Sequence, residues 1–419
     1  MKLVRQASLL QRSPQLRVPH VRRGYATLRN RGLAHDLVSF HRQLVEIESV
    51  SGNEKPLGEW LANSLQSQGY NVEKQYLSHQ PERFNVLAWP GDVRDASVML
   101  TSHIDTVPPF LPYRRDNNGT IYGRGSVDAK GSVAAQVLAV NNLLSTSQIS
   151  PSDVSMLFVV GEEVGGVGMK LANELQLKPR VIIFGEPTEG KLVAGHKGII
   201  VAHIHAKGQA AHSGYPWLGR SATDILVAAA ARLRHLGDQL PQCEKYGKTT
   251  INLGLVEGGV ALGVVAEKAS AGLAVRIAAG SPGDIQSAIT LAVREAVAPF
   301  LGSDMKESDI VELDFGSPGY GPIDLDCDVP GFDVTVVNYG TDIPWLRKTV
   351  RDQKRYLYGP GTIFVAHTDH ESLTEADLLG AAKGYEKIVL HSLRKLRAEE
   401  PRTSYVTEKE VSEFSVLGC

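Results

Sequence analysis

Histidine and carboxylate side chains follow several short apolar runs of this sequence, and the first pair is His103 and Asp105. In an extended chain these two side chains point the same way, because side chains alternate between the two faces of a strand. The Asp105 carboxylate can then accept the second N–H of the imidazole, which orients His103 as a metal ligand and raises its basicity. A surface pair of the same two residues is the alternative, and the pair alone favours it.

Asp128 lies in the glycine-rich segment 123–131, just before a helix that we expect from Ser132 to Leu144. The glycines allow the backbone to approach a ligand closely. The Asp128 carboxylate can cap the helix, or it can bridge two cations.

Glu162 and Glu163 directly follow the apolar run from Val154 to Val160. Two adjacent carboxylates repel each other unless a cation neutralises one of them. Adjacent side chains cannot face the same ligand in regular structure, so we expect one to bind a metal and the other to meet a water molecule. Two solvated glutamates in a loop are the alternative.

Five further positions carry residue types that suit a metal or an anion. Glu186 follows the next apolar run, and His367 and His370 compete for a ligand role, with His367 favoured. His212 lies in a glycine-containing turn and Arg276 in an expected strand. By residue type alone, such a histidine and such an arginine are usually structural.

Short apolar strands alternate with amphipathic helices from residue 36 onward, which predicts a parallel sheet covered on both faces. From about residue 199 the order changes to strand, helix, two strands, helix, strand, the order of a ferredoxin-like unit. The sequence therefore predicts an α/β protein with an inserted unit. The expected segments are a basic leader at 1–35, a main domain at 36–198 and 317–398, the inserted unit at 199–316 and a polar tail at 399–419.

Composition excludes several classes of function. The chain has 44 basic and 46 acidic residues among 419 and a formal net charge of -2, so nothing favours nucleic acid as a partner. No apolar run approaches about 18 residues, so we expect no membrane-spanning helix. The three cysteines are far apart, so any metal site must use oxygen and imidazole ligands.

The first 35 residues are rich in arginine, and the first acidic residue is Asp36. An acid-free leader of this kind is typical of a mitochondrial transit peptide. A basic tail without a targeting role is the alternative.

Taken together, the motifs resemble the zinc-dependent family that contains acetylornithine deacetylase, succinyl-diaminopimelate desuccinylase, aminoacylase and glutamate carboxypeptidase. The resemblance covers about residues 36 to 395 and is carried by SHIDTVPPF, GRGSVDAKGSVAAQ, GEPTE, GHKG, AHSGYPWLGRSA and AVRIAAG. Within the family the chain most resembles the fungal proteins described as probable carboxypeptidases. The resemblance implies a parallel-sheet zinc-peptidase domain with an inserted ferredoxin-like lid, through which two chains form a homodimer.

The resemblance also implies a role for each candidate residue. Two zinc ions per subunit, with cobalt or manganese as alternatives, would share one carboxylate. Asp105 would orient a ligand, and Glu162 would be the general base. His212 would reach the active site of the partner subunit, and Arg276 would bind the substrate's carboxylate. The ligands would be His103, Asp128 and Glu186 for one zinc ion, and Asp128, Glu163 and His367 for the other.

The implied activity is hydrolysis of a peptide or N-acyl amide bond next to a free carboxylate, as in a carboxypeptidase. An N-acyl-amino-acid deacylase and an inactive metal-binding interaction protein are the alternatives. Two features depart from the family pattern. Gly263 and Ala266 stand where an asparagine and a proline are usual, which suggests an altered substrate or reduced activity. The basic leader differs from the apolar signal of the fungal relatives, which are usually secreted.

Overall fold

The structure is a computed structural model that describes residues 33–399. The predicted leader lies outside these residues except for its last three positions, and the predicted tail lies outside them from residue 400 onward. Within the described residues no helix is both long and apolar enough to cross a membrane.

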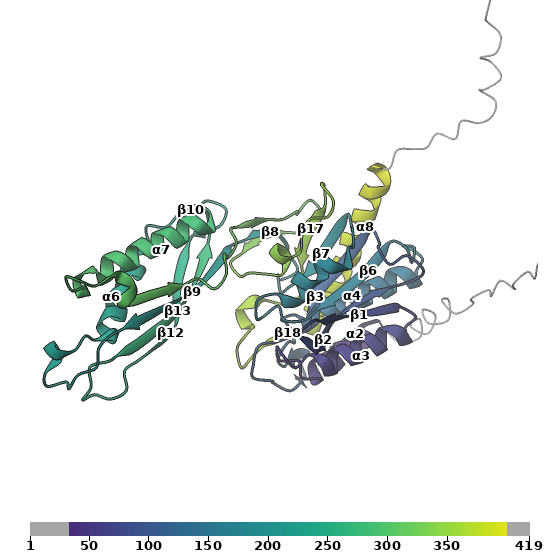
Figure 1. The fold of residues 1–419 in the computed structure, drawn as a ribbon. Coiled ribbons are helices and arrows are strands. Elements are labelled where there is room, and N and C mark those ends of the chain that lie inside the picture. Colours follow the sequence, from purple (N-terminus) through teal and green to yellow (C-terminus); the bar gives the residue numbers. More distant parts are fainter. Residues whose placement is uncertain (1–32, 400–419) are drawn as a thin grey trace, which may run out of the picture.

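A six-stranded sheet forms the centre of the larger part of the molecule, which we call the body (Figure 1). Four of its strands are parallel, as predicted, and two antiparallel strands extend one edge. The sequence did not predict this edge pair, because β1 is polar and only partly buried. In spatial order the strands are β1 (Asn71–Leu77), β2 (Gln80–Trp89), β6 (Val154–Val159), β3 (Val98–His103), β7 (Val181–Gly185) and β17 (Lys354–Tyr358).

Helices cover the main sheet on both faces, which confirms the α/β class. One face packs against a large apolar core, and the opposite face packs against a smaller core built from α5 and the segment 343–346. The helices of the body are α2 (Leu33–Glu46), α3 (Lys55–Ser67), α4 (Lys130–Ser145), α5 (Val167–Ala172) and α8 (Glu375–Glu399).

Two small sheets support the loops at the edge of the body. One joins the strand that follows Glu186 to the segment after residue 320, and the other joins the Asp128 loop to the segment after His367. Their strands are β15 (Ile323–Asp324), β8 (Leu192–His196) and β16 (Val334–Val337), and then β18 (Ser372–Thr374), β5 (Thr120–Tyr122) and β4 (Arg114–Arg115).

Residues 198–315 form a separate unit of one sheet and one layer of helices, and this unit projects from the body as an arm (Figure 1). Its four-stranded sheet is antiparallel throughout and has the order β12-β13-β9-β14, with two helices packed on one face around an apolar core. Each of these helices begins at a serine whose side chain accepts a backbone N–H in the first turn. The elements follow the order expected from the sequence: β9 (Gly198–Lys207), α6 (Ala222–Gly237), β12 (Thr250–Gly258), β13 (Lys268–Ile277), α7 (Pro282–Val297) and β14 (Val311–Asp314). A two-stranded hairpin, β10 (Gln242–Cys243) and β11 (Gly247–Lys248), completes the arm.

Candidate active site

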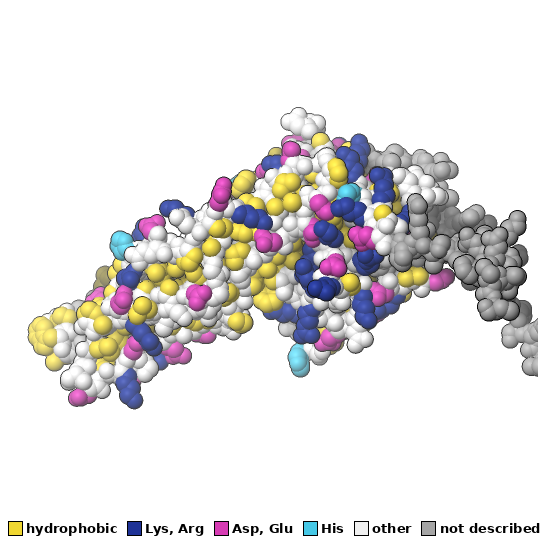
Figure 2. Space-filling model, turned by 90° about the horizontal axis from the view of Figure 1, so that it is seen from above, with side chains coloured by type: hydrophobic (Ala, Val, Ile, Leu, Met, Phe, Trp, Pro, Cys, Tyr) yellow, Lys and Arg dark blue, Asp and Glu magenta, His cyan; other side chains and the backbone are white. Residues whose placement is uncertain are grey.

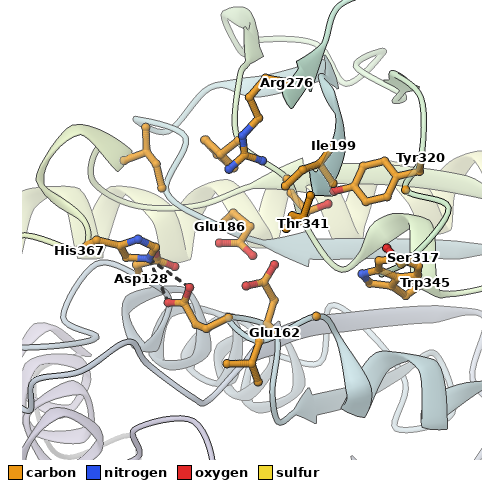
Figure 3. Close-up of a pocket in the computed structure, with 18 residues that line it drawn as sticks. Asp128, Glu162, Glu186, Ile199, Arg276, Ser317, Tyr320, Thr341, Trp345 and His367 are labelled. Atoms are coloured by element: carbon orange, nitrogen blue, oxygen red, sulfur yellow. Dashed lines mark hydrogen bonds and ion pairs between the residues drawn. The ribbon is translucent and has the colours of Figure 1, made fainter. Parts of the chain in front are cut away.

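A cavity of about 490 Å³ lies where the carboxyl ends of the parallel strands meet the base of the arm, and we call it the reaction cavity. Open α/β sheets bind ligands at this end of their strands, because the loops there come from several strands at once. Figure 3 shows side chains from the body and from the arm pointing into the same space. Its walls include Asp128, Glu162, Glu163, Glu186, Arg276, Tyr320, Trp345 and His367.

Three of the predicted ligands converge at the end of β3. The His103 side chain is almost completely buried, and its Nε2 lies 3.1 Å from an Asp128 oxygen and 3.7 Å from a Glu186 oxygen. These atoms are close enough to share one cation. The structure therefore brings together the end of β3, the loop before α4 and the residue after β7, which are far apart in sequence.

The second group of predicted ligands uses the other side of Asp128. His367 Nε2 lies 3.3 Å from the second Asp128 oxygen and 3.1 Å from Glu163, and these three residues can also hold a cation. Asp128 thus presents one carboxylate oxygen to each histidine, which is the arrangement of a carboxylate shared by two metal ions. His367 has φ +62°, a left-handed conformation that a non-glycine residue adopts at a cost and that is frequent at functional sites.

Two alternatives considered for the sequence do not match the structure. His370 is exposed and lies 2.8 Å from Asp369, away from both groups of ligands. Asp128 does not cap α4, because the residue before that helix is Ala129 and no side chain caps its N-terminus.

The sequence predicted that the Asp105 carboxylate orients His103. In the structure this carboxylate lies nearer to the backbone of the Glu162 turn than to the His103 ring. His103 Nδ1 lies 2.9 Å from the backbone oxygen of Asp105 but 3.6 Å from its carboxylate. That carboxylate instead accepts the backbone N–H groups of Glu162, at 3.0 Å, and Glu163, at 3.2 Å. Asp105 therefore joins strand β3, which ends at the ligand His103, to the turn that contains the ligand Glu163.

A buried ion pair that the sequence did not reveal holds the Asp128 loop in place. Glu371 accepts the N–H groups of Val127 and Asp128, both at 3.2 Å, with one oxygen, and binds Arg124 at 2.6 Å with the other. Both charged side chains are at most 3% exposed. Because Glu371 is four residues from His367, this contact joins the segments of two ligands that share the second group. The only local signal was a glutamate near the two histidines.

Burial raises the pKa of several acids in the cavity, and the neighbouring carboxylates add to this effect. Burial raises the pKa of Glu186 to about 7, and the charges of Asp128 and Glu163 act in the same direction. Burial also raises the pKa of Glu162 well above its ordinary value. Hydrogen bonds to Asp128 and Glu163 raise the pKa of His367 to about 10.

Asp128 is the exception among these acids. Burial opposes its ionised form, but hydrogen bonds to His103 and His367 hold its pKa below the usual range. The site thus gathers buried carboxylates around the buried His103 imidazole and the half-exposed His367 imidazole, and these groups repel or protonate one another without a cation. Oxygen and imidazole donors of this kind suit Zn²⁺, and also Co²⁺ or Mn²⁺. The residues present therefore fit a metal centre.

Glu162 and Arg276 face the cavity without belonging to either ligand group. Figure 3 shows the Glu162 carboxylate opposite Glu186 at the centre of the site, with Arg276 pointing in from the arm. Among the described residues no carboxylate forms an ion pair with the Arg276 guanidinium, although opposite charges usually compensate a partly buried arginine. This free cation is suited to bind an anionic group of a ligand.

His212 lies apart from the reaction cavity of its own chain. It is an exposed residue of the arm loop 208–219, where its Nδ1 lies 3.0 Å from the backbone nitrogen of Gly214. It forms a bridge with Val264, so it neighbours the segment of Gly263. The structure does not place His212 among the residues that line the cavity.

The fold and the paired ligand groups are those of a metal-dependent peptidase. The family model Peptidase family M20/M25/M40 matches residues 99–311. A "probable carboxypeptidase" of Aspergillus terreus is 49% identical over 377 residues, covering 84% of this chain and 85% of the relative. A protein of the same description from Arthroderma otae is 45% identical over 398 residues, covering 86% and 87%. The chain belongs to this peptidase family and is a metallopeptidase.

Solved structures share the fold at lower sequence identity. A metallo-carboxypeptidase of the M20 family from Sulfolobus solfataricus is 16% identical, with a TM-score of 0.66, and covers 85% of this chain and 99% of its own. A tripeptidase from Staphylococcus aureus is 22% identical, with a TM-score of 0.69, and covers 85% and 99%. At these identities the likeness concerns the fold.

Proposed function

We propose that the chain is a di-zinc hydrolase that cleaves a peptide or N-acyl amide bond next to a free carboxylate, in the manner of a carboxypeptidase. The observation that carries the proposal is the position of Asp128, which presents one oxygen to His103 and the other to His367. The unpaired Arg276 in the same cavity supports the preference for a carboxylate, and the descriptions of the fungal relatives agree with it.

The residues divide the reaction among them. Zinc held by the two ligand groups would supply Lewis-acid activation of the attacking water and of the amide carbonyl. Glu162 takes the proton of the water and passes it to the leaving amine. Burial and neighbouring carboxylates favour the protonated form of Glu162, which suits the second of these tasks. Arg276 pairs with the substrate's carboxylate and so orients the amide.

The arm contributes to this reaction as part of a homodimer. His212 is exposed and outside the cavity of its own chain, so it acts on the cavity of the partner subunit, where it stabilises the negative charge that develops on the carbonyl oxygen. The exposed apolar residues of strand β12 support a contact between two arms, because an unpaired edge strand of this kind is a site for association.

The test is a Glu162→Gln variant, measured with dipeptides and N-acetyl amino acids on zinc-loaded protein. The variant removes the base but keeps the size of the side chain, so we expect turnover to fall by about 10²- to 10⁴-fold while zinc binding persists. Near-normal turnover with bound zinc would show that the base is a different residue.

The same substrates separate the carboxypeptidase from the deacylase, which uses the same zinc ligands and the same arginine. Preference for dipeptides supports the proposal, and preference for N-acetyl amino acids supports the deacylase. No turnover of any amide by the zinc-loaded protein would favour the inactive metal-binding interaction protein, and chelator-sensitive turnover of any amide would exclude it. A Gly263→Asn variant, tested with the same substrates, shows whether the departure from the family pattern changes selectivity.

The cellular location is a separate proposal that rests on the basic leader. We infer import into mitochondria, with secretion as the alternative suggested by the fungal relatives. Microscopy of the full chain with a C-terminal fluorescent tag, beside a chain that begins at Asp36, tests it. Loss of mitochondrial signal in the shortened chain supports import, and signal in the medium contradicts it.

A further inference from the structure

A second cavity, of about 350 Å³, adjoins the reaction cavity. Arg276, Tyr339 and Ile363 line both of them. The hydroxyl of Tyr339 donates a hydrogen bond of 2.8 Å to the backbone oxygen of Pro187, which fixes the tyrosine in the shared wall. The guanidinium proposed to hold the substrate's carboxylate therefore lies at the junction of two spaces.

The walls of the second cavity combine five apolar residues with four uncharged polar residues, which are Thr188, Thr335, Asn338 and Thr362. Its one acidic side chain, Glu189, forms an ion pair of 2.8 Å with Lys191, so its charge is compensated. Two of the apolar side chains are open to solvent, with Val336 38% and Phe364 82% exposed. The apolar lining consists of Pro187, Val336, Val337, Ile363 and Phe364.

We propose that this second cavity receives the side chain of the substrate residue that carries the free carboxylate, and that it selects bulky apolar side chains. The inference rests on the proposed function, in which Arg276 pairs with that carboxylate. Three groups branch from one α-carbon: the carboxylate, the side chain and the nitrogen of the bond to be cleaved. With the carboxylate on Arg276 and the nitrogen near Glu162, the side chain is directed to the remaining space that Arg276 lines.

The lining predicts the order of preference. An added methylene group that fills an apolar pocket changes kcat/KM by about tenfold or more, so leucine and phenylalanine should exceed alanine by at least that factor. Aspartate and lysine should be poor, because their charges would lose water without gaining a partner.

The experiment measures kcat/KM of the zinc-loaded protein for N-acetyl-alanyl-X and for N-acetyl-X, with X as alanine, leucine, phenylalanine, aspartate or lysine. In both series X supplies the leaving amine and the free carboxylate. The result therefore does not depend on whether the enzyme is a carboxypeptidase or a deacylase. Leucine and phenylalanine as the best substrates in the better series support the proposal.

Charge placed in the wall tests the cavity itself. Val336→Asp should lower kcat/KM for X as leucine by about tenfold and raise it for lysine, whereas Val336→Lys should raise it for aspartate. Val334→Asp is the matched control. Val334 lies on the same strand two residues away and is 52% exposed, but does not line the cavity. A folding defect lowers kcat/KM for all substrates together and cannot reverse their order.

Two results would overturn the proposal in distinguishable ways. If kcat/KM hardly depends on X, or if Val336 and Val334 variants behave alike, while Arg276→Met still raises KM for every substrate, the second cavity is not the side-chain site and the proposed function stands. If the zinc-loaded protein hydrolyses neither series, the proposed function fails and the inference fails with it.

Discussion

The body clusters carboxylates that carry like charges, whereas the arm exposes apolar side chains to solvent. In the body, carboxylates gather around the buried Asp128, the buried His103 and the 52%-exposed His367, and burial raises the pKa of Glu186 to about 7. In the arm, several large apolar side chains are exposed: Leu255 and Val256 on the edge strand are 62% and 66% exposed, and Leu262 in the following loop is fully exposed. Figure 2 shows hydrophobic side chains gathered along the arm and at its tip.

The difference indicates what each part lacks. Buried like charges are relieved by cations, so the body is suited to metal ions. An exposed apolar edge strand favours association with another protein surface, so the arm suits the contact with a second copy of the chain that we propose. A change in one part should therefore alter metal binding, and a change in the other should alter association.

The largest effect on the body should come from Glu371→Gln. The variant weakens the contacts that hold Asp128 and join its loop to the segment of His367. Loss of a partner that orients a ligand typically lowers metal affinity by about 10- to 100-fold, and we expect a fall of that size. Competition with a chelating dye measures the affinity, and the visible spectrum of the cobalt-substituted protein reports the ligand geometry.

Glu375→Gln is the matched control for this prediction. It removes the ion pair between Arg115 and Glu375, which joins the same two segments nearer the surface, where the side chains are 49% and 26% exposed. Exposed ion pairs contribute about 0–1 kcal/mol, so zinc affinity should hardly change. Equal losses in both variants would mean that Glu371 has only a general structural role.

Leu255→Asp in the arm should dissociate the proposed homodimer. A carboxylate on the edge strand opposes pairing with a second edge strand, so the mass measured by light scattering should fall from that of a dimer to that of a monomer. Zinc affinity should stay the same. Leu291→Asp on α7 is the control, because Leu291 is 57% exposed but lies on a helix rather than on the edge strand. A wild-type monomer, or a dimer that survives the substitution, would contradict the assignment of this surface.

The metal-free body should become less stable as the pH rises from about 5 to 9. The folded-state pKa of Glu186, about 7, exceeds its ordinary value of 4.5, so between these values the folded state holds a proton that the unfolded state has lost. The stability contributed by His367, whose pKa is raised to about 10, is likewise lost as the pH rises toward that value. The melting temperature of chelator-treated protein should therefore fall by roughly a few degrees across this range.

Zinc should reverse that trend, because metal binding requires deprotonated ligands and grows stronger as the pH rises. A Glu186→Gln variant should flatten the lower part of the metal-free curve. A metal-free melting temperature that rises steadily from pH 5 to 9 would show that the buried carboxylates are not in excess.

Much of the fold follows from local patterns in the sequence. The buried strands β3, β6 and β7 are apolar runs, and each is followed by a residue of the site, so their chemistry was visible before their positions in space. The arm was predictable for the same reason, since its strands and helices alternate in one recognisable order. The polar edge strand β1 has no such run and was missed.

The parts of the site that the sequence did not predict depend on contacts between distant segments. Glu371 acts on backbone N–H groups more than 240 positions away, and no spacing rule connects them. Asp105 binds the Glu162 turn through backbone groups whose direction is set only by the folded loop. The second cavity beside Arg276 combines side chains from the body and the arm, so it exists only once both are assembled.

The central claim is that one carboxylate, Asp128, joins two metal sites. Equilibrium dialysis of chelator-treated protein against zinc, with metal analysis, tests it most directly. Wild-type protein should bind two zinc ions per chain, and His103→Ala and His367→Ala should each bind one, because each histidine belongs to a different group. A single zinc ion in the wild type, or two in the His367→Ala variant, would contradict the account.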